Sequence, residues 1–224
     1  MSLPLTYAIS VNANIINKPD DTERKKIDLG KDFQPIEATL DEIFRHVSRG
    51  HAMAPQYRNG HRKTSNFIRS GFLAADVDEG MTLEEAKDHP IVRHHAGLIH
   101  TTASHTEEKH RFRIIFPLDE PILNGLDWTD AQFALAVALG SDKSVSDGAR
   151  MFFGSTRATV IWFRQTMPSH VVADLIARGR EVRVINKSTR GRLLPLDSAR
   201  RIAGAEVIKV ATGESVRRTR SAPT

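Results

Sequence analysis

Cysteine is absent from the 224 residues of this chain. Its absence excludes disulfide bonds, thiolate catalysis and cysteine-ligated zinc. The sequence also has no hydrophobic run near the roughly 20 residues that a membrane-spanning helix requires, and its first ten residues lack the basic head and apolar stretch of a signal peptide. The composition, 40% hydrophobic and 26% charged, is that of an ordinary globular protein, for which we expect a cytoplasmic location.

Acidic residues are scarce at the C-terminal end. The net charge of the whole chain is +5, but residues 178–224 hold twelve Lys or Arg and only four Asp or Glu. Such a basic segment favours polyanions such as nucleic acid, and a solvated, partly disordered terminus explains the same charge equally well. We therefore expect a folded domain over residues 1–177, followed by a basic extension over residues 178–224 that is weakly ordered or helical.

The spacing of hydrophobic residues and of capping motifs predicts a mixed α+β domain. Capping boxes at Thr39–Glu42 and Thr82–Glu85 predict helices that end at Gly50 and Pro90. Two further helices are expected, one from Thr129–Gln132 to Gly140 and one from Ser169 to Arg178. The expected strands are residues 6–11, the run before Asp76, and two hairpins formed by 96–102 with 111–118 and by 151–153 with 158–163. Loops are expected over residues 17–31 and 51–66.

Two aspartates end an apolar run in the stretch Phe72–Gly80. Residues two apart in a strand point to the same face, so Asp76 and Asp78 direct their carboxylates to one point at the strand end. Two convergent carboxylates are costly to hold together unless a cation lies between them. Oxygen ligands of this kind suit Mg²⁺ or Mn²⁺. The alternative is a strand that ends in an ordinary polar turn.

Two arginines share one face of the strand predicted at residues 111–118. Phe112, Ile114 and Phe116 form the face that must be buried, and Arg111 and Arg113 lie on the other. Neighbouring guanidinium groups repel unless anions lie across them, and their planar forks match phosphate oxygens. A nucleoside triphosphate is therefore a natural partner of this face. The alternative is that both arginines bond to Asp or Glu side chains.

Several loops add residues of the same chemistry. Asp142 follows a predicted helix and precedes a predicted strand, so it can reach a central site, although Asp147 is a rival and either can be a turn residue. Ser104 and His105 lie in the loop before Arg111 and can donate to phosphate. The basic loop over residues 51–66, which contains Lys63, leads into the strand with the aspartates. The spacing of the clustered histidines, which fits neither helical nor strand ligand geometry, argues against a zinc site.

Together these motifs resemble the catalytic domain of the archaeo-eukaryotic primase superfamily, in particular the primase-polymerase domains of plasmids, phages and integrated elements. The first motif of that family matches Leu73–Gly80, with its two aspartates. The second matches Thr101–His105 together with Arg111–Arg113, and the third matches Asp142 followed after eight residues by Arg150–Gly154. The resemblance covers roughly residues 36–163 and implies an RRM-like sheet that bears the metal site, with helices packed on it.

The resemblance also implies an activity and a set of residue roles. The implied activity is template-directed synthesis of primers, and their extension, on single-stranded DNA by a two-metal mechanism in which NTP or dNTP is the substrate. Asp76, Asp78 and Asp142 would hold two Mg²⁺ or Mn²⁺ ions. The residues implied to contact the nucleotide are Ser104, His105, Arg111 and Arg113, with Lys63, His110 and Arg150 as further candidates.

One departure and two rival functions accompany this interpretation. Many members place a serine and a histidine two apart where this chain has Arg111 and Arg113, so His105, His110 or the arginine pair replaces that histidine. A metal-dependent nuclease and a non-catalytic nucleic-acid-binding accessory domain of replication remain alternatives. The sequence contains no P-loop, so we expect the replicative helicase to act either in trans or as a further part of a longer protein, linked through residues 178–224.

Overall fold

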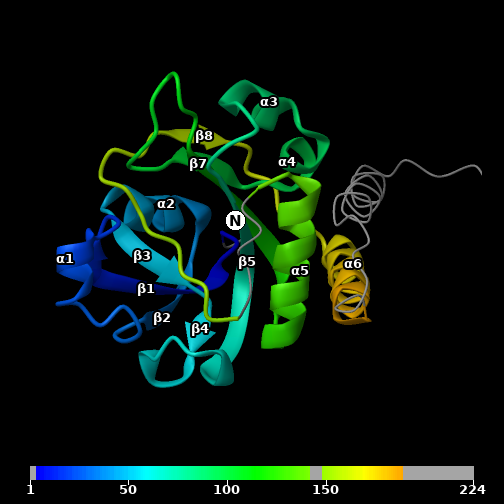
Figure 1. The fold of residues 1–224 in the computed structure, drawn as a ribbon, viewed down its shortest axis with the longest axis horizontal. Coiled ribbons are helices and arrows are strands. Elements are labelled where there is room, and N and C mark those ends of the chain that lie inside the picture. The colour runs from blue at the N-terminus through cyan, green and yellow to red at the C-terminus, as the bar shows by residue number, and fades with distance from the viewer. Residues whose placement is uncertain (1–3, 142–147, 189–224) are drawn as a thin grey trace, which may run out of the picture.

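Two antiparallel β-sheets, with helices packed on them, make up the computed structural model, which describes residues 4–141 and 148–188 (Figure 1). The predicted α+β class is confirmed. Among the described residues, no helix combines the length and the apolar character needed to cross a membrane.

The smaller sheet has three strands in the order β2-β1-β3. Its central strand β1 (Tyr7–Ile16) pairs with both β2 (Gln34–Ala38) and β3 (His51–Ala54). Helix α2 (Leu40–Ser48) begins at the predicted capping box, in which the Thr39 side chain accepts from the Glu42 amide, and it buries Leu40, Ile43 and Val47. The short helix α1 (Asp21–Arg24) lies in the connection between β1 and β2.

The larger sheet has five strands in the order β4-β5-β7-β6-β8 and carries the two sequence motifs at its centre. Strand β5 ends in the aspartates, and β7 begins with the arginine motif. The bounds are Gln56–Tyr57 for β4, Phe67–Val77 for β5, Leu98–Thr101 for β6, Phe112–Ile122 for β7 and Val160–Trp162 for β8. The remaining helices are η1 (Arg58–Gly60), η2 (Thr64–Asn66), α3 (Leu83–Asp88), α4 (Pro90–His95), α5 (Gly125–Ala138) and α6 (Ser169–Ser188).

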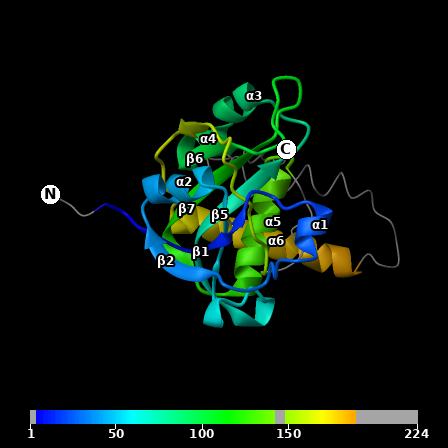
Figure 2. The ribbon, with the colours of Figure 1, turned by 90° about the vertical axis from the view of Figure 1, so that its left-hand side faces the viewer.

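Helix α5 packs against β5, and α6 packs against α5, so these helices cover one side of the larger sheet (Figures 1 and 2). The Trp128 indole donates to the carbonyl of Phe72 at 3.0 Å and ties α5 to β5. Strand β1 crosses β5 at Gly71, where a Cβ atom would lie 2.4 Å from the Ala8 nitrogen. Only glycine allows this approach, which closes the core between the two sheets.

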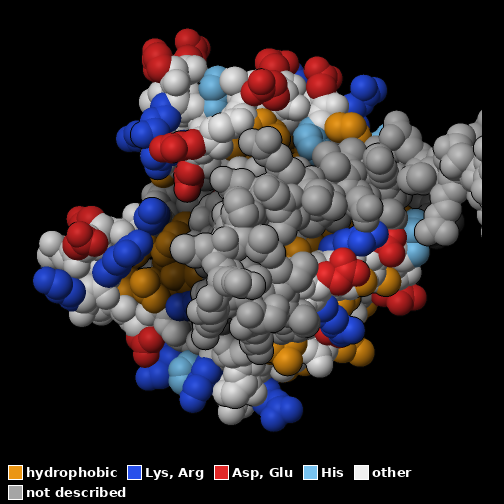
Figure 3. All heavy atoms as spheres, turned by 45° about the vertical axis from the view of Figure 1, so that its right-hand side comes forward, with side chains coloured by type: hydrophobic (Ala, Val, Ile, Leu, Met, Phe, Trp, Pro, Cys, Tyr) orange, Lys and Arg blue, Asp and Glu red, His pale blue; other side chains and the backbone are white. Residues whose placement is uncertain are grey.

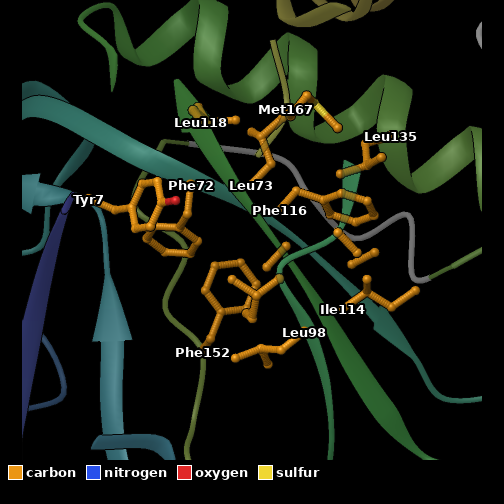
Figure 4. Packing of buried hydrophobic residues seen from close by; sticks show 14 of the residues in the cluster. Tyr7, Phe72, Leu73, Leu98, Ile114, Phe116, Leu118, Leu135, Phe152 and Met167 are labelled. Carbon is orange, nitrogen blue, oxygen red and sulfur yellow. The ribbon is translucent and has the colours of Figure 1, made fainter. Parts of the chain in front are cut away.

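The core itself is continuous across both sheets. Phe72 of β5 and Phe152 pack edge to face with ring centroids 5.8 Å apart, and Tyr7 of β1 lies beside them (Figure 4). Burial of this apolar surface is the main favourable term in folding. It fixes β5 and β7 rigidly, and the polar residues at their ends are positioned as a result.

Several element predictions hold and others are wrong. The hairpin of β6 and β7 and the helix after Thr39 are confirmed. The loop expected at residues 51–66 instead contains β3, β4 and two 3₁₀ turns, and the one expected at 17–31 contains α1. The hairpin expected at 151–163 does not form, because Phe152 pairs with Met53 and β8 pairs with β6. Helix α5 starts earlier than expected, at the Asn124 cap, and α6 continues past Arg178 to Ser188.

Candidate functional site

The pairing of β5 with β7 brings the aspartates and the arginines together. In the antiparallel register Asp76 lies opposite Arg113, and two residues further on an Arg111 nitrogen lies 3.8 Å from an Asp78 oxygen. Side chains that face each other across neighbouring strands are close enough to form ion pairs. The arginines therefore bond to the aspartates, which is the alternative that the sequence left open for this face.

Asp76 is the most enclosed of these residues. Its Oδ1 accepts from Nε of Arg113 at 2.5 Å, and its Oδ2 accepts from a guanidinium nitrogen of Arg150 at 3.0 Å. Burial raises the pKa of Asp76, but the charges and hydrogen bonds of the two arginines outweigh it and lower that pKa below its ordinary value. Asp76 is thus an ionised carboxylate between two guanidinium groups.

The two inner arginines are held on their other sides as well. Arg113 donates to the carbonyl of Phe153 at 2.6 Å. The guanidinium carbons of Arg113 and Arg150 lie 5.0 Å and 5.6 Å from the centre of the Phe152 ring, within the range of a cation–π contact. The segment that follows Arg150 therefore closes the site from the side of β3, and sequence reasoning had treated this segment as part of a hairpin.

Asp78 lies in a different environment. Its side chain is 57% exposed, and its contact with Arg111 is a long one. A loose, exposed ion pair contributes little to stability. The oxygens of Asp78 are therefore available to a ligand, whereas those of Asp76 are each occupied once.

A pocket of about 260 Å³ lies over these side chains. Asp76, Arg113 and Arg150 form its inner wall, and Asp78 and Arg111 lie beside them. Ser104, from the loop before β7, also lines it. Lys18 and Arg24, which precede β2 in the chain, also line the pocket. Their role could not be predicted from the sequence, because they lie in a stretch without hydrophobic periodicity. Only the fold brings them to the pocket.

The other predicted residues have different positions. His105 accepts a hydrogen bond from the Arg111 amide at 3.0 Å and so braces the start of β7. His110 accepts from the Leu83 amide at 3.4 Å and lines a neighbouring cavity together with Asp78. Lys63 is exposed and is not among the residues that line the pocket. Asp142 and its rival Asp147 lie outside the described residues.

A buried histidine that sequence reasoning did not single out lies next to the inner wall. His100 of β6 is opposite Arg113 in the sheet, and its side chain is completely buried. Its Nδ1 contacts the Thr101 carbonyl at 3.1 Å, and its Nε2 has no hydrogen-bond partner. Burial, together with the charge of Arg113, lowers the pKa of His100 to about 3. His100 is therefore a neutral, buried imidazole beside Arg113.

The donor set fits the divalent ions that the motifs imply. Asp78 offers exposed oxygens at the pocket, and each Asp76 oxygen accepts one hydrogen bond while a carboxylate oxygen has two acceptor sites. Within the described residues no group of three or more His, Asp or Glu side chains is arranged to hold a metal ion. The surrounding cationic side chains suit phosphate, so a metal–phosphate ligand matches the lining better than a bare ion.

Fold and site together define an α+β domain with a phosphate-suited pocket at the end of its central strands. Residues 45–168, more than half of the chain, match the VapE N-terminal domain family, and the chain belongs to that family. This membership confirms the relationship to phage and plasmid primase-polymerase domains that the motifs predicted, and it supports a primase-like part in replication.

Comparison with solved structures returned the AEP domain of the cyanophage S-2L primase-polymerase (PrimPol). The match has a TM-score of 0.44 and 11% sequence identity, and it covers 76% of this chain and 89% of that one. No curated protein matched the chain.

Proposed function

We propose that this chain is a template-directed nucleotidyltransferase that makes, and extends, primers on single-stranded DNA in the replication of a phage, plasmid or other mobile element. The single observation that supports the proposal is the pocket in which Asp76 and Asp78 meet Arg111, Arg113 and Arg150, in a chain whose family assignment spans all five residues. Carboxylates beside a cluster of guanidinium groups suit a metal-bound triphosphate.

In this proposal the arginines bind and orient the nucleotide. Arg111 lines the pocket and is only loosely paired, so its guanidinium is free to contact the β- and γ-phosphates. Arg113 and Arg150 form the back of the phosphate site, where Asp76 holds them in position. Ser104 donates from the loop before β7, while His105 keeps that loop against Arg111.

The aspartates hold the metal ions in the same proposal. Asp78 and Asp76, joined by Asp142, are the ligands, and His110 and Lys63 are further contacts to nucleotide or template. Mg²⁺ or Mn²⁺ held by these residues would lower the pKa of the 3′-hydroxyl and stabilise the charge of the leaving pyrophosphate. Positive charge beside the pocket keeps the negatively charged DNA and the nucleotide near each other despite their mutual repulsion.

The remaining parts of the proposal concern the chain ends and partners. Residues 1–177 form the catalytic domain, and the basic residues from Arg178 onward supply contacts to the single-stranded template. Because no P-loop is present, a replicative helicase acts with this domain, in trans or as a further part of the same protein. These events take place in the cytoplasm.

Primer synthesis on single-stranded DNA with labelled NTP or dNTP, in Mg²⁺ and then in Mn²⁺, tests the function. The sharpest variant is Asp78→Asn, because this exposed side chain contributes little to folding. We expect its incorporation rate to fall by about 100-fold or more, the scale on which charge-stabilising catalytic groups act. Asp119→Asn, an exposed aspartate at the far end of β7, is the matched control.

Two outcomes would overturn parts of the proposal. A wild-type rate in Asp78→Asn removes this residue from the metal site. The absence of incorporation by the wild-type protein in both metals and with both kinds of nucleotide removes the polymerising function altogether.

One observation favours a second candidate, a phosphate-binding accessory domain without catalysis. Both oxygens of Asp76 accept from guanidinium groups, as they would if this carboxylate only anchored arginines that grip a nucleic-acid phosphate. Mn²⁺ binding in the presence of a nucleoside triphosphate, followed by electron paramagnetic resonance, separates the candidates. The proposed enzyme binds the metal through Asp78, so its Mn²⁺ spectrum should differ between the wild-type protein and Asp78→Asn, whereas the two spectra should be the same for an accessory domain that contacts only the phosphates.

A further inference from the structure

The segment between β1 and β2 forms a wall of the pocket through a fixed attachment at Asn17. The Asn17 amide donates to the Gly50 carbonyl at 2.8 Å, and its side-chain oxygen accepts from the Thr156 amide at 2.8 Å. Its side-chain nitrogen donates to the Thr156 hydroxyl at 3.3 Å. Asn17 has a φ of 61°, a left-handed conformation that asparagine tolerates better than most residues. Lys18, the next residue, is thereby held beside the site.

The loop to which Asn17 is attached is the one that carries Arg150 to Asp76. The Gly154 amide donates to the His51 carbonyl at 3.1 Å, and the Ser155 amide donates to the Val47 carbonyl at 2.9 Å. A Cβ atom at position 154 would lie 2.6 Å from the Val47 carbonyl oxygen, so the approach requires glycine. Lys18 and Arg150 are therefore fixed to opposite ends of one short, well-bonded segment.

Arg24 is positioned by the cap of helix α1. Asp20 accepts from the amides of Thr22 and Glu23, both at 2.8 Å, and Glu23 accepts from the Asp20 amide at 3.1 Å. This reciprocal capping box engages the carboxylates of Asp20 and Glu23. Arg24 closes the last turn of the helix and lines the pocket.

The cations around the pocket differ in whether they are paired. Arg111, Arg113 and Arg150 each form an ion pair with an aspartate. Within residues 4–141 and 148–188, no ion pair joins Lys18 or Arg24 to a carboxylate, and both side chains are exposed. On the face drawn in Figure 3, Lys and Arg side chains lie beside a patch of hydrophobic side chains at the left of the view. Two uncompensated cations at the rim of a pocket attract anionic ligands.

We propose that Lys18 and Arg24 form a phosphate-binding rim that grips phosphate oxygens of the ligand entering the pocket. The proposal rests on the proposed function for the identity of that ligand: its phosphates belong either to the single-stranded nucleic acid or to the incoming nucleoside triphosphate. Both residues lie before the stretch that matches the family, residues 45–168, so the family assignment does not cover them.

The test compares two charge-matched double variants in binding measurements that need no catalysis. Lys18→Ala/Arg24→Ala removes the rim, whereas Lys25→Ala/Lys26→Ala removes two positive charges from adjacent exposed positions that do not line the pocket. One arm measures the polarisation of a labelled oligothymidylate across a salt titration. The other measures binding of a fluorescent nucleoside triphosphate with Mn²⁺ in the absence of DNA.

We expect the rim variant to lose about tenfold or more in affinity in one arm, the scale of losing hydrogen bonds to charged groups, while the control variant stays near wild type. If single-stranded DNA is the ligand, the slope of log affinity against log salt concentration should also fall by about 1.4, the value for two phosphate contacts to single-stranded DNA. A loss confined to the nucleotide arm assigns the rim to the triphosphate.

The outcomes separate this proposal from the proposed function. Equal affinities of the rim and control variants in both arms overturn the rim, even when the wild-type protein synthesises primers. A rim-dependent loss of binding in a protein that incorporates no nucleotide supports the rim and overturns the enzyme. Unchanged melting temperatures exclude misfolding as the cause, and Lys18→Arg/Arg24→Lys, which keeps both charges, should restore most of the affinity.

Discussion

Both walls of the pocket contain charged side chains, but those of the inner wall are tightly paired with one another and those of the outer wall are loosely paired or unpaired. On the inner wall the carboxylate of Asp76 lies between two arginines whose side chains are 7% and 18% exposed. On the outer side Asp78 and Arg111 are paired loosely, and Lys18 and Arg24 have no carboxylate partner among the described residues. Ion pairs that are buried are costly to break, and exposed ones are not. The ion pairs of the inner wall therefore contribute to stability, and the loosely paired or unpaired groups of the outer side remain available to a ligand.

The largest effect expected from this contrast is on stability. Asp76→Ala leaves Arg113 and Arg150 without their shared carboxylate, and breaking a buried pair in this way costs about 3–5 kcal/mol. Asp78→Ala should cost less than about 1 kcal/mol. Urea unfolding at neutral pH measures both. We also expect Asp76→Ala to abolish nucleotide incorporation. Equal losses of stability in the two variants would remove the distinction between the walls.

The second effect is a dependence of stability on pH that originates behind the inner wall. Burial lowers the pKa of His100 to about 3 in the folded state, against about 6.5 in an unfolded chain. Below about pH 6.5 the unfolded state therefore binds one more proton at His100 than the folded state does. This difference lowers the free energy of unfolding by about 1.4 kcal/mol per pH unit until the folded pKa is reached.

His100→Phe isolates this contribution, because phenylalanine has no proton to bind. The slope of unfolding free energy against pH between about pH 6 and pH 4.5 should be smaller in the variant by about 1.4 kcal/mol per unit. His94→Phe, at an exposed position, controls for the loss of a histidine as such. An unchanged slope in His100→Phe would show that folding does not lower the pKa of this side chain.

Asp76 adds a second acid transition at lower pH. Its pKa is lowered in the folded state by Arg113 and Arg150, so the ion pairs stabilise the fold fully above the unfolded pKa of about 3.9 and lose this contribution as the pH falls through the folded pKa. Asp76→Asn should therefore lose the part of the acid transition below about pH 4 and keep the part due to His100.

The parts of this site that could be predicted from sequence are those that depend on one strand or one hairpin. The period of two along β5 placed Asp76 and Asp78 together, and the turn before Arg111 placed that strand in a hairpin. Both follow from local pattern. The α+β class followed from the order of the expected strands and helices, and the family relationship followed from the motifs.

The parts that could not be predicted depend on tertiary contacts. Arg150 reaches Asp76 across 74 positions of sequence, and Phe152 pairs with Met53 instead of forming the expected hairpin, because its ring fills the core against Phe72. Tertiary packing of this kind overrides local strand propensity. Lys18 lines the pocket next to Asn17, which is bonded to Gly50 and Thr156, and no periodicity marks either residue.

The loosely held Arg111 allows the role of the outer wall to be tested. Arg111→Ala removes a guanidinium that lines the pocket but is held only by a 3.8 Å contact. We expect the KM for nucleotide to rise about tenfold, with a change in unfolding free energy below about 1 kcal/mol. Steady-state incorporation with varied nucleotide measures the first and urea unfolding the second. Arg69→Ala, which breaks a similarly exposed pair with Glu37 at the other end of β5, should leave KM unchanged.

The smallest expected effect tests whether the outer wall needs its attachment. Asn17→Gly keeps the left-handed backbone, which glycine adopts without cost, and removes both side-chain bonds to Thr156. Loss of neutral hydrogen bonds of this kind should weaken ligand binding about two- to tenfold, because Lys18 is then less firmly positioned. Asn59→Gly is the matched control, because Asn59 in η1 also has a left-handed backbone, with φ 54°, but does not line the pocket. This variant should not weaken binding. If Asn17→Gly bound ligand as tightly as Asn59→Gly, Lys18 and Arg24 would act through their charge alone. The bonds that hold the segment at Asn17 would then make no contribution to phosphate binding.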